Sequence, residues 1–539
     1  MNGIHNHRNT CQKYLILLFL IITAITCIFP FDDCICDGIV VCKWISFGIA
    51  FCCCILLTSF VGPSLFADLE GAAKDASVIK IPFLLTTIVV SIHSILQISG
   101  IKPVNSDNYF HVLAGFDNPA GLSAALAVSF PFAISIIDKA KDRRIRFILL
   151  SFLFLIDVSI SIIAHSRVGF LSIGTVGLIY VIHNIEDKRK KKLIAILFAS
   201  LFFVAVLFMS FQKKGSNSGR LLILNVCWEM FKDAPLFGHG IHGFRSQYML
   251  YQADYLASCS SLAFSMLADN ITHPMNEYVL LAVNLGLTGI ATLLVAIAIT
   301  IIHYFKNPSN ESFIGIITLA AIGVLSLFSY PFRYPLTVLG LVCALLLVYK
   351  DMLLKFSRTT MIILRSIIAT ISAFCICFTI IWANYQIQWS NLSVVSDTGN
   401  DTKSILAGYR NLYPKLKNDP YFLYNYAYAL SESGDCYKAE SMATKSFDLM
   451  ANYDTALFIA DNAKECGDVV EAEEFYWLAS KMCPVKFMPL YSLFCLYRDT
   501  GRIAQMTDIG NTILSKPIKV NSSEIMMIKA QVEQTLKIE

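Results

Sequence analysis

The chain has 539 residues, of which 56% are hydrophobic and only 15% charged, with a net charge of +4. A soluble protein would carry about a quarter charged residues, so this composition excludes an ordinary soluble protein and predicts a polytopic membrane protein. No basic tract is long enough to indicate binding to nucleic acid.

A transmembrane helix needs ~20 mainly apolar residues. About eleven runs approach or exceed this length, and the run at 335–350 is short. They lie at 14–30, 39–60, 78–99, 113–137, 146–164, 168–184, 192–211, 277–303, 312–329, 335–350 and 360–383. The first run lacks a small-residue cleavage site and is interpreted as an uncleaved helix. We therefore expect an all-α polytopic membrane domain over residues 1–383.

Basic connections set the orientation of these helices. Helix parity places the segments Lys139–Arg146 and Glu186–Lys192 on one side, together with the connection after Lys350. That side is predicted to be cytoplasmic. The opposite side then receives a long polar loop, about 212–273, and the whole C-terminus.

The cysteines show no metal-ligand spacing. Cys52, Cys53 and Cys54 lie in an apolar run, where thiols behave as small hydrophobic groups. Cys34 and Cys36 flank a predicted outer loop and are either paired in a disulfide or free. We expect neither a metal nor a cofactor.

The polar interval 212–273 is rich in Arg, His, Gly and Pro although the chain on both sides of it is apolar. Such an interval at a membrane surface indicates a ligand site. Arg220 in this interval, and Arg167 between two predicted helices, carry planar cations that suit a phosphate or diphosphate. The alternative for each is an interfacial arginine whose charge extends to water. Arg245 and Arg333 are further candidates for substrate binding.

The end of the polar interval reads T-H-P-M-N-E-Y. A histidine can accept a proton from a hydroxyl nucleophile near neutral pH, which makes His273 a catalytic candidate. Asn276 and Glu277 are candidates to orient its ring or to contact a substrate. The alternative is a helix cap. The glycines within Gly238–Gly243 are expected to form a tight turn, and Asp117 and Asn118 in G-F-D-N-P to cap the next helix.

After about residue 384 the hydropathy falls, and three helical segments follow at a fixed period. Their turn glycines are Gly434, Gly467 and Gly501, spaced 33 and 34 residues apart. A helix, a Gly turn and a second helix at this period resemble tetratricopeptide repeats. The alternative is an unrelated helical bundle. We expect a helical-repeat domain over 384–539, on the side of the membrane opposite the cytoplasm, that binds a protein partner.

The order of several motifs, rather than any one of them, is informative. G-F-D-N-P, S-R-V-G, S-G-R, D-A-P-L-F-G-H-G, H-P-M-N-E and N-L-G-L-T-G succeed one another between residues 105 and 350. This order resembles the O-antigen ligase and O-antigen polymerase superfamily, and the C-terminal repeats resemble those of some members. Many members carry a second histidine immediately before the asparagine, where this chain has Met275.

The resemblance implies transfer of a glycan from an undecaprenyl-diphosphate carrier to an acceptor hydroxyl at the periplasmic face of a bacterial inner membrane. It implies that Arg167 and Arg220 hold the diphosphate and that His273 is the base or orients the acceptor, without a metal. The acceptor is open: lipid A core in lipopolysaccharide biosynthesis, a protein in an O-oligosaccharyltransferase, or a growing glycan in a polymerase. A lipid-linked sugar transporter and a membrane scaffold are the remaining alternatives. The near absence of charges in the spans, apart from Asp157, argues against a central aqueous pathway.

Overall fold

A computed structural model describes residues 14, 16–28, 35, 40–60, 77–102, 104, 110–197, 200, 214–259, 261–353, 355–397 and 402–538. Every regular element within these residues is a helix. The chain forms two compact units, one of Met1–Phe211 with Leu293–Ile387 and the other of Gln212–Thr292 with Gln388–Glu539. Cys34 and Cys36 lie outside the described residues, so their pairing stays open.

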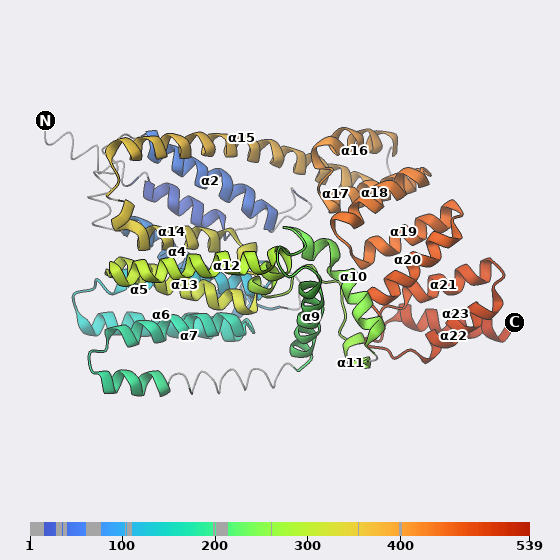
Figure 1. Cartoon of the computed structure of the whole chain (residues 1–539), viewed down its shortest axis with the longest axis horizontal. Coiled ribbons are helices and arrows are strands. Elements are labelled where there is room, and N and C mark those ends of the chain that lie inside the picture. The colour runs from blue at the N-terminus through green and yellow to red at the C-terminus, as the bar shows by residue number, and fades with distance from the viewer. Residues whose placement is uncertain are drawn as a thin grey trace. The chain divides into compact units, whose positions relative to one another are not determined.

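The first unit holds most of the apolar helices (Figure 1). They are α2 (Val40–Phe60), α4 (Ser77–Ile98), α5 (Pro119–Ile137), α6 (Arg143–Ile163), α7 (Arg167–Asn184), α13 (Asn310–Phe328), α14 (Pro335–Leu353) and most of α15 (Arg358–Asp397). Its core centres on α5, most of whose residues are buried. The small residues of this helix allow close packing: a methyl group at Gly169 of α7 would lie 2.7 Å from the Ser123 side chain of α5.

Eight helices among the described residues are long and apolar enough to cross a membrane. The prediction of a polytopic helical membrane protein is therefore confirmed. The sequence predicted about eleven spans. Of the other three, α7 has 18 residues and carries Arg167 at one end and His183 and Asn184 at the other; the first run contains the shorter apolar helix Ile16–Thr26; and 192–211 lies mostly outside the described residues.

The polar interval, expected as a loop, is largely helical. It contains α9 (Lys214–Asp233), α10 (Gly243–Ser258) and the short α11 (Leu262–Ser265), and it leads into α12 (Glu277–Lys306). Leu222, Val226 and Met230 recur every four residues along α9 and are buried, which is the spacing of one face of a helix. The low mean hydropathy of the interval conceals this periodicity.

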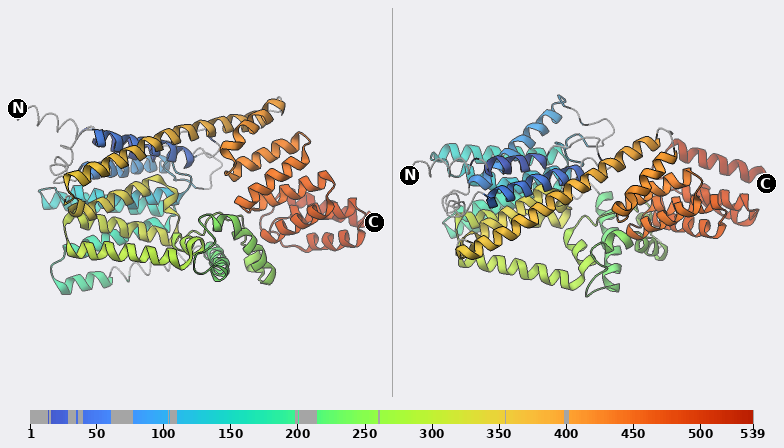
Figure 2. Two further views of the ribbon diagram at one scale, coloured as in Figure 1. Left: turned by 45° about the horizontal axis from the view of Figure 1, so that its top comes forward. Right: turned by 90° about the horizontal axis from the view of Figure 1, so that it is seen from above.

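The C-terminal part of the second unit is a row of antiparallel helices, each packed on the next (Figure 2). The row comprises α16 (Thr402–Leu416), α17 (Pro420–Glu432), α18 (Cys436–Leu449), α19 (Tyr453–Cys466), α20 (Val469–Met482), α21 (Met488–Asp499), α22 (Ile503–Ser515) and α23 (Ser523–Ile538). Gly434, Gly467 and Gly501 turn the chain between paired helices with φ of 80°, 84° and 70°. These are left-handed conformations that favour glycine, so the predicted turns are confirmed. Their assignment as tetratricopeptide repeats stays a prediction.

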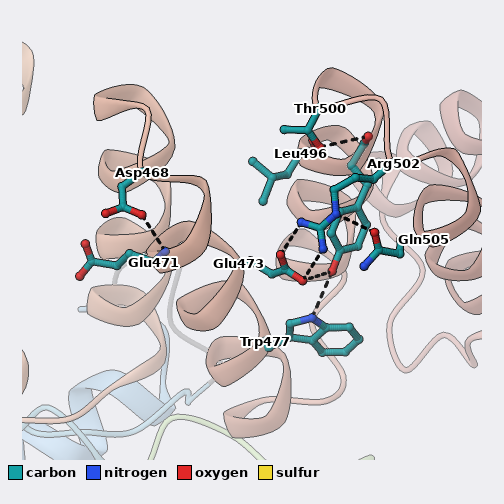
Figure 3. Close-up of polar contacts among 9 residues, drawn as sticks. Asp468, Glu471, Glu473, Trp477, Leu496, Thr500, Arg502 and Gln505 are labelled. Atoms are coloured by element: carbon teal, nitrogen blue, oxygen red, sulfur yellow. Dashed lines mark hydrogen bonds and ion pairs between the residues drawn. The ribbon is translucent and has the colours of Figure 1, made fainter.

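Successive pairs in this row are joined by polar contacts as well as apolar packing (Figure 3). Glu473 of α20 accepts hydrogen bonds from Arg502 Nη1 at 2.5 Å and from the Tyr497 hydroxyl at 2.7 Å. The Arg502 guanidinium also lies over the Tyr497 ring, 4.5 Å from its centroid. A charge-assisted bond of this kind fixes the register between neighbouring pairs.

Candidate functional site

The sequence T-H-P-M-N-E-Y folds into a tight turn at the start of α12. The His273 Nδ1 accepts a hydrogen bond from the Met275 backbone amide at 3.0 Å. The His273 Nε2 lies 3.7 Å from Glu277 Oε2 one helical turn further on. Both side chains are mostly buried. The structure therefore brings together three of the predicted residues, since Asn276 lies between them.

The hydrogen bond at Nδ1 determines which nitrogen of His273 carries a proton. A backbone amide can only donate, so Nδ1 must be the acceptor, and the neutral ring then carries its proton on Nε2. In this state Nε2 is a hydrogen-bond donor that faces the Glu277 carboxylate. His273 can orient an oxygen atom through Nε2–H, but in this geometry it cannot take up a proton there.

Asn276 is the cap of α12, as one of the alternatives predicted. Its Oδ1 accepts from the backbone amides of Tyr278 at 2.9 Å and Val279 at 3.1 Å. Met275 precedes it with φ of 56°. A non-glycine residue in this region is strained by about 1–3 kcal/mol and persists only where its surroundings hold it there. This strained residue stands at the position where many members of the superfamily that the sequence resembles carry a second histidine.

A break in α12 positions this turn from the other side. Gly286 has φ of 61° and ψ of −152°, which interrupts the helix. In a continuous helix the amides of residues 287 and 288 would donate to the carbonyls of 283 and 284. Instead, Leu287 N–H donates to the Pro235 carbonyl at 2.8 Å and Thr288 N–H to the Leu236 carbonyl at 3.1 Å.

The two carbonyls released by the break are also satisfied by the polar interval. Val283 O accepts from the His239 amide and Asn284 O from the Gly240 amide, both at 2.9 Å. The D-A-P-L-F-G-H-G segment therefore occupies the break in N-L-G-L-T-G. A methyl group at Gly286 would lie 2.6 Å from the Leu236 backbone. The two motifs form one structural element, which the sequence alone did not reveal.

Asn284 is a residue that the sequence analysis missed. Its Oδ1 accepts from the Phe244 amide at 2.9 Å and its Nδ2 donates to the Ile241 carbonyl at 2.8 Å. The side chain thus joins the first half of α12 to the start of α10. The available signal was an asparagine two residues before a glycine inside a mainly apolar helix. His239 in the same segment bonds through Nε2 to the Met230 carbonyl at 2.7 Å, which is a structural role.

The two arginines of the polar interval lie on different helices of the second unit. Arg220 is in the second turn of α9, and Arg245 is in the first turn of α10. The Arg245 guanidinium lies over the Tyr421 ring, 5.2 Å from its centroid, and its Nε is 3.1 Å from the Met450 sulfur. Neither of these partners is anionic.

Arg167 and Arg333 lie in the first unit. Arg167 is the first residue of α7, after Ser166, whose Oγ accepts from the Gly169 amide. A helix N-terminus carries a partial positive charge, so an arginine there adds to a field that favours an anion.

Arg333 is held by the G-F-D-N-P segment, in the turn η1 (Pro331–Arg333). Its Nη2 lies 3.4 Å from Asp117 Oδ2, and Asp117 Oδ1 accepts from the Tyr334 hydroxyl at 2.7 Å. Burial, reinforced by the Asp117 charge, raises the pKa of Tyr334, so its hydroxyl remains a donor. Asn118 caps α5 as expected, through the Ala120 amide at 2.8 Å. Asp117 was also expected to cap this helix, but it binds Arg333 and Tyr334 instead.

Within the second unit, α10 packs directly on the C-terminal helices. Gln252 is fully buried there. Its Nε2 donates to the Met482 carbonyl at 2.8 Å and to the Asp269 carbonyl at 3.1 Å, and its Oε1 accepts from the Tyr248 hydroxyl at 3.1 Å. The adjacent Asn270 donates to Asp454 of α19 at 3.0 Å. The segment that carries His273 is therefore attached to the helical pairs three residues before the histidine.

The fold and these contacts define a multi-pass helical membrane protein. Its candidate site is the turn from His273 to Glu277, where the polar interval meets the start of α12. Residues 150–294 match the family model described as O-antigen ligase. The match includes all the predicted site residues except Arg333 and supports a glycan-transferring enzyme with a lipid-linked glycan substrate. No curated protein matches the chain.

Proposed function

We propose that this protein transfers a glycan from an undecaprenyl-diphosphate donor to an acceptor hydroxyl at the periplasmic face of the inner membrane. The observation that carries the proposal is the coincidence of the O-antigen ligase match with the constrained His273–Glu277 pair at the start of α12. A strained backbone and two mostly buried polar side chains at one helix start are features of functional sites.

Arg167 and Arg220 are proposed to hold the diphosphate. In the reaction the bond between the anomeric carbon and the diphosphate oxygen breaks, and the acceptor oxygen bonds to that carbon. Negative charge increases on the departing diphosphate. Fixed guanidinium groups stabilise this charge more in the transition state than in the bound substrate, which accelerates the reaction without a metal.

The acceptor hydroxyl loses its proton in the same step, and the geometry favours Glu277 as the group that receives it. His273 Nε2 is a donor in the neutral tautomer, because Nδ1 accepts from the Met275 amide. It therefore suits orientation of the acceptor oxygen or of the Glu277 carboxylate 3.7 Å away. This assignment gives the acceptor-orienting role to His273 and the role of base to Glu277.

The helical pairs favour a ligase or a protein O-oligosaccharyltransferase over a polymerase. They pack directly on the polar interval through Gln252 and Asn270, and helical pairs of this kind present extended surfaces to large partners. A polymerase is the alternative. A transporter or a scaffold would give no reason for the strained and constrained start of α12.

The test is glycan transfer in a bacterial strain that lacks this protein and accumulates the lipid-linked donor. His273→Ala and Arg220→Ala are compared with His242→Ala, a control whose exposed side chain does not cap its helix. We expect loss of transfer with normal membrane abundance in the first two and normal transfer in the control. Unchanged transfer in both site variants would refute the assignment and favour a transport or scaffolding role.

A further inference from the structure

One face of α17 displays a row of tyrosines. Tyr421, Tyr424 and Tyr428 are spaced by three and four residues, which places them on one side of the helix. Tyr421 is 51% exposed and Tyr428 is 49% exposed. Phe458 of α19 packs against Tyr424 and Tyr428, with ring centroids 5.6 and 6.3 Å away. Together with Arg245, these four residues are called the tyrosine face.

The arginine at one end of this face points to an anionic ligand. Arg245 is half-buried, and its recorded contacts among the described residues, the Met450 sulfur and the Tyr421 ring, carry no negative charge. Its guanidinium lies over the exposed Tyr421 ring instead. A guanidinium that is partly removed from water without a counter-charge is unfavourable, and a bound carboxylate or phosphate would supply that charge.

The rest of the face has both aromatic and hydrogen-bonding character. The two exposed large hydrophobic side chains of α17 are tyrosines, and α19 has none among its described residues. Each tyrosine offers a flat apolar ring and a hydroxyl. Two carboxylates, Asp454 and Asp461, lie close to Tyr424. Burial raises the pKa of Tyr424, and the negative charge of Asp454 raises this pKa further. The carboxylate oxygens accept hydrogen bonds from Asn270 and Tyr476, respectively.

We propose that the tyrosine face binds an oligosaccharide that carries a carboxylate or phosphate substituent. The apolar C–H faces of sugar rings stack on tyrosine, sugar hydroxyls bond to the phenol and carboxylate oxygens, and Arg245 binds the anionic substituent. An apolar peptide would instead call for exposed aliphatic side chains on α17 and α19, which are absent from their described residues. That the protein encounters such a glycan rests on the proposed transferase function. The binding itself does not depend on that function and can be measured separately.

The experiment measures binding by the purified full-length protein in detergent. The probes are an oligogalacturonate, a neutral malto-oligosaccharide of equal length and an acidic peptide of glutamates. We expect preferential binding of the oligogalacturonate. Tyr421→Ala and Tyr428→Ala each weaken it about 3- to 10-fold. Arg245→Gln weakens it about 10-fold or more while neutral binding is unchanged.

Tyr437→Ala is the matched control, because Tyr437 lies on α18 outside the tyrosine face and is 79% exposed. It should bind as the wild type does. No binding of either saccharide, equal loss in the control, or preference for the peptide would each overturn the proposal. Saccharide binding without any transferase activity would support the tyrosine face while refuting the proposed function, and transfer without saccharide binding would do the reverse.

Discussion

The attachment of the polar interval to the C-terminal helices can be tested at Gln252. Its amide bridges the Met482 and Asp269 carbonyls and accepts from Tyr248, and all these contacts lie within the second unit. Gln252→Leu keeps most of the side-chain volume but removes these bonds. The change therefore isolates the polar contribution from that of packing.

The expected loss follows from the three hydrogen bonds. Each contributes about 1 kcal/mol net, and a buried carbonyl left without a donor adds to the loss. Burial of the apolar leucine offsets part of it, at about 0.8 kcal/mol per methylene. We expect a net destabilisation of about 2–3 kcal/mol, which for a unit of about 150–250 residues lowers Tm by about 5–10 °C.

The assay is thermal unfolding of the full-length protein in detergent, followed by the appearance of protease cleavage between residues 259 and 277. Gln534→Leu is the control, because Gln534 is exposed on α23 and its replacement should change stability by less than about 0.5 kcal/mol. An unchanged Tm in Gln252→Leu, or an equal decrease in the control, would show that Gln252 does not join the polar interval to the helical pairs.

Other predictions concern the helix break, the base and a pair-to-pair contact. Gly286→Ala places a methyl group against backbone in a conformation restricted to glycine, so membrane abundance should fall, whereas Gly219→Ala meets no atom within 4 Å and should be tolerated. Glu277→Gln should abolish transfer at normal abundance; transfer at the wild-type rate would exclude this residue as the base. Hydrogen bonding from Arg502 lowers the pKa of Glu473 below its ordinary value of 4.5. The contribution of this ion pair to folding stability is therefore present above pH 4.5 and is lost as the pH falls through the lowered pKa of Glu473. The Tm difference between wild type and Glu473→Gln should therefore narrow with acidification, and a constant difference would contradict this reasoning.

The sequence predicted best the features that depend on local chemistry. Gly434, Gly467 and Gly501 were recognisable because a helical hairpin needs a left-handed residue at its turn. Asn118 was recognisable as a cap because it directly precedes a proline at the start of a helix. In both cases the information lies within a few neighbouring residues.

Features that depend on distant segments could not be predicted in this way. The run that became α12 is apolar apart from a few residues such as Asn284 and Gly286. Those residues can mark an irregularity, but nothing local shows that residues from 235 to 240 replace the helix hydrogen bonds at Gly286. The fully buried Gln252 lies in a polar stretch, where a glutamine is ordinarily exposed. Its partner, the Met482 carbonyl, is more than 200 residues away, and only the packed structure brings them together.

The position of His273 is therefore determined by two sets of contacts within the second unit. The helix break fixes the direction of the first half of α12 through Leu287 and Thr288. The helical pairs hold the preceding segment through Asn270, and Gln252 of α10 holds it through the Asp269 carbonyl. Removing the C-terminal helices would expose buried α10 residues and release this segment, so a truncation would disturb the candidate catalytic turn as well as any partner surface. Point variants on the exposed face of α17 separate the two roles, because they leave both sets of contacts in place.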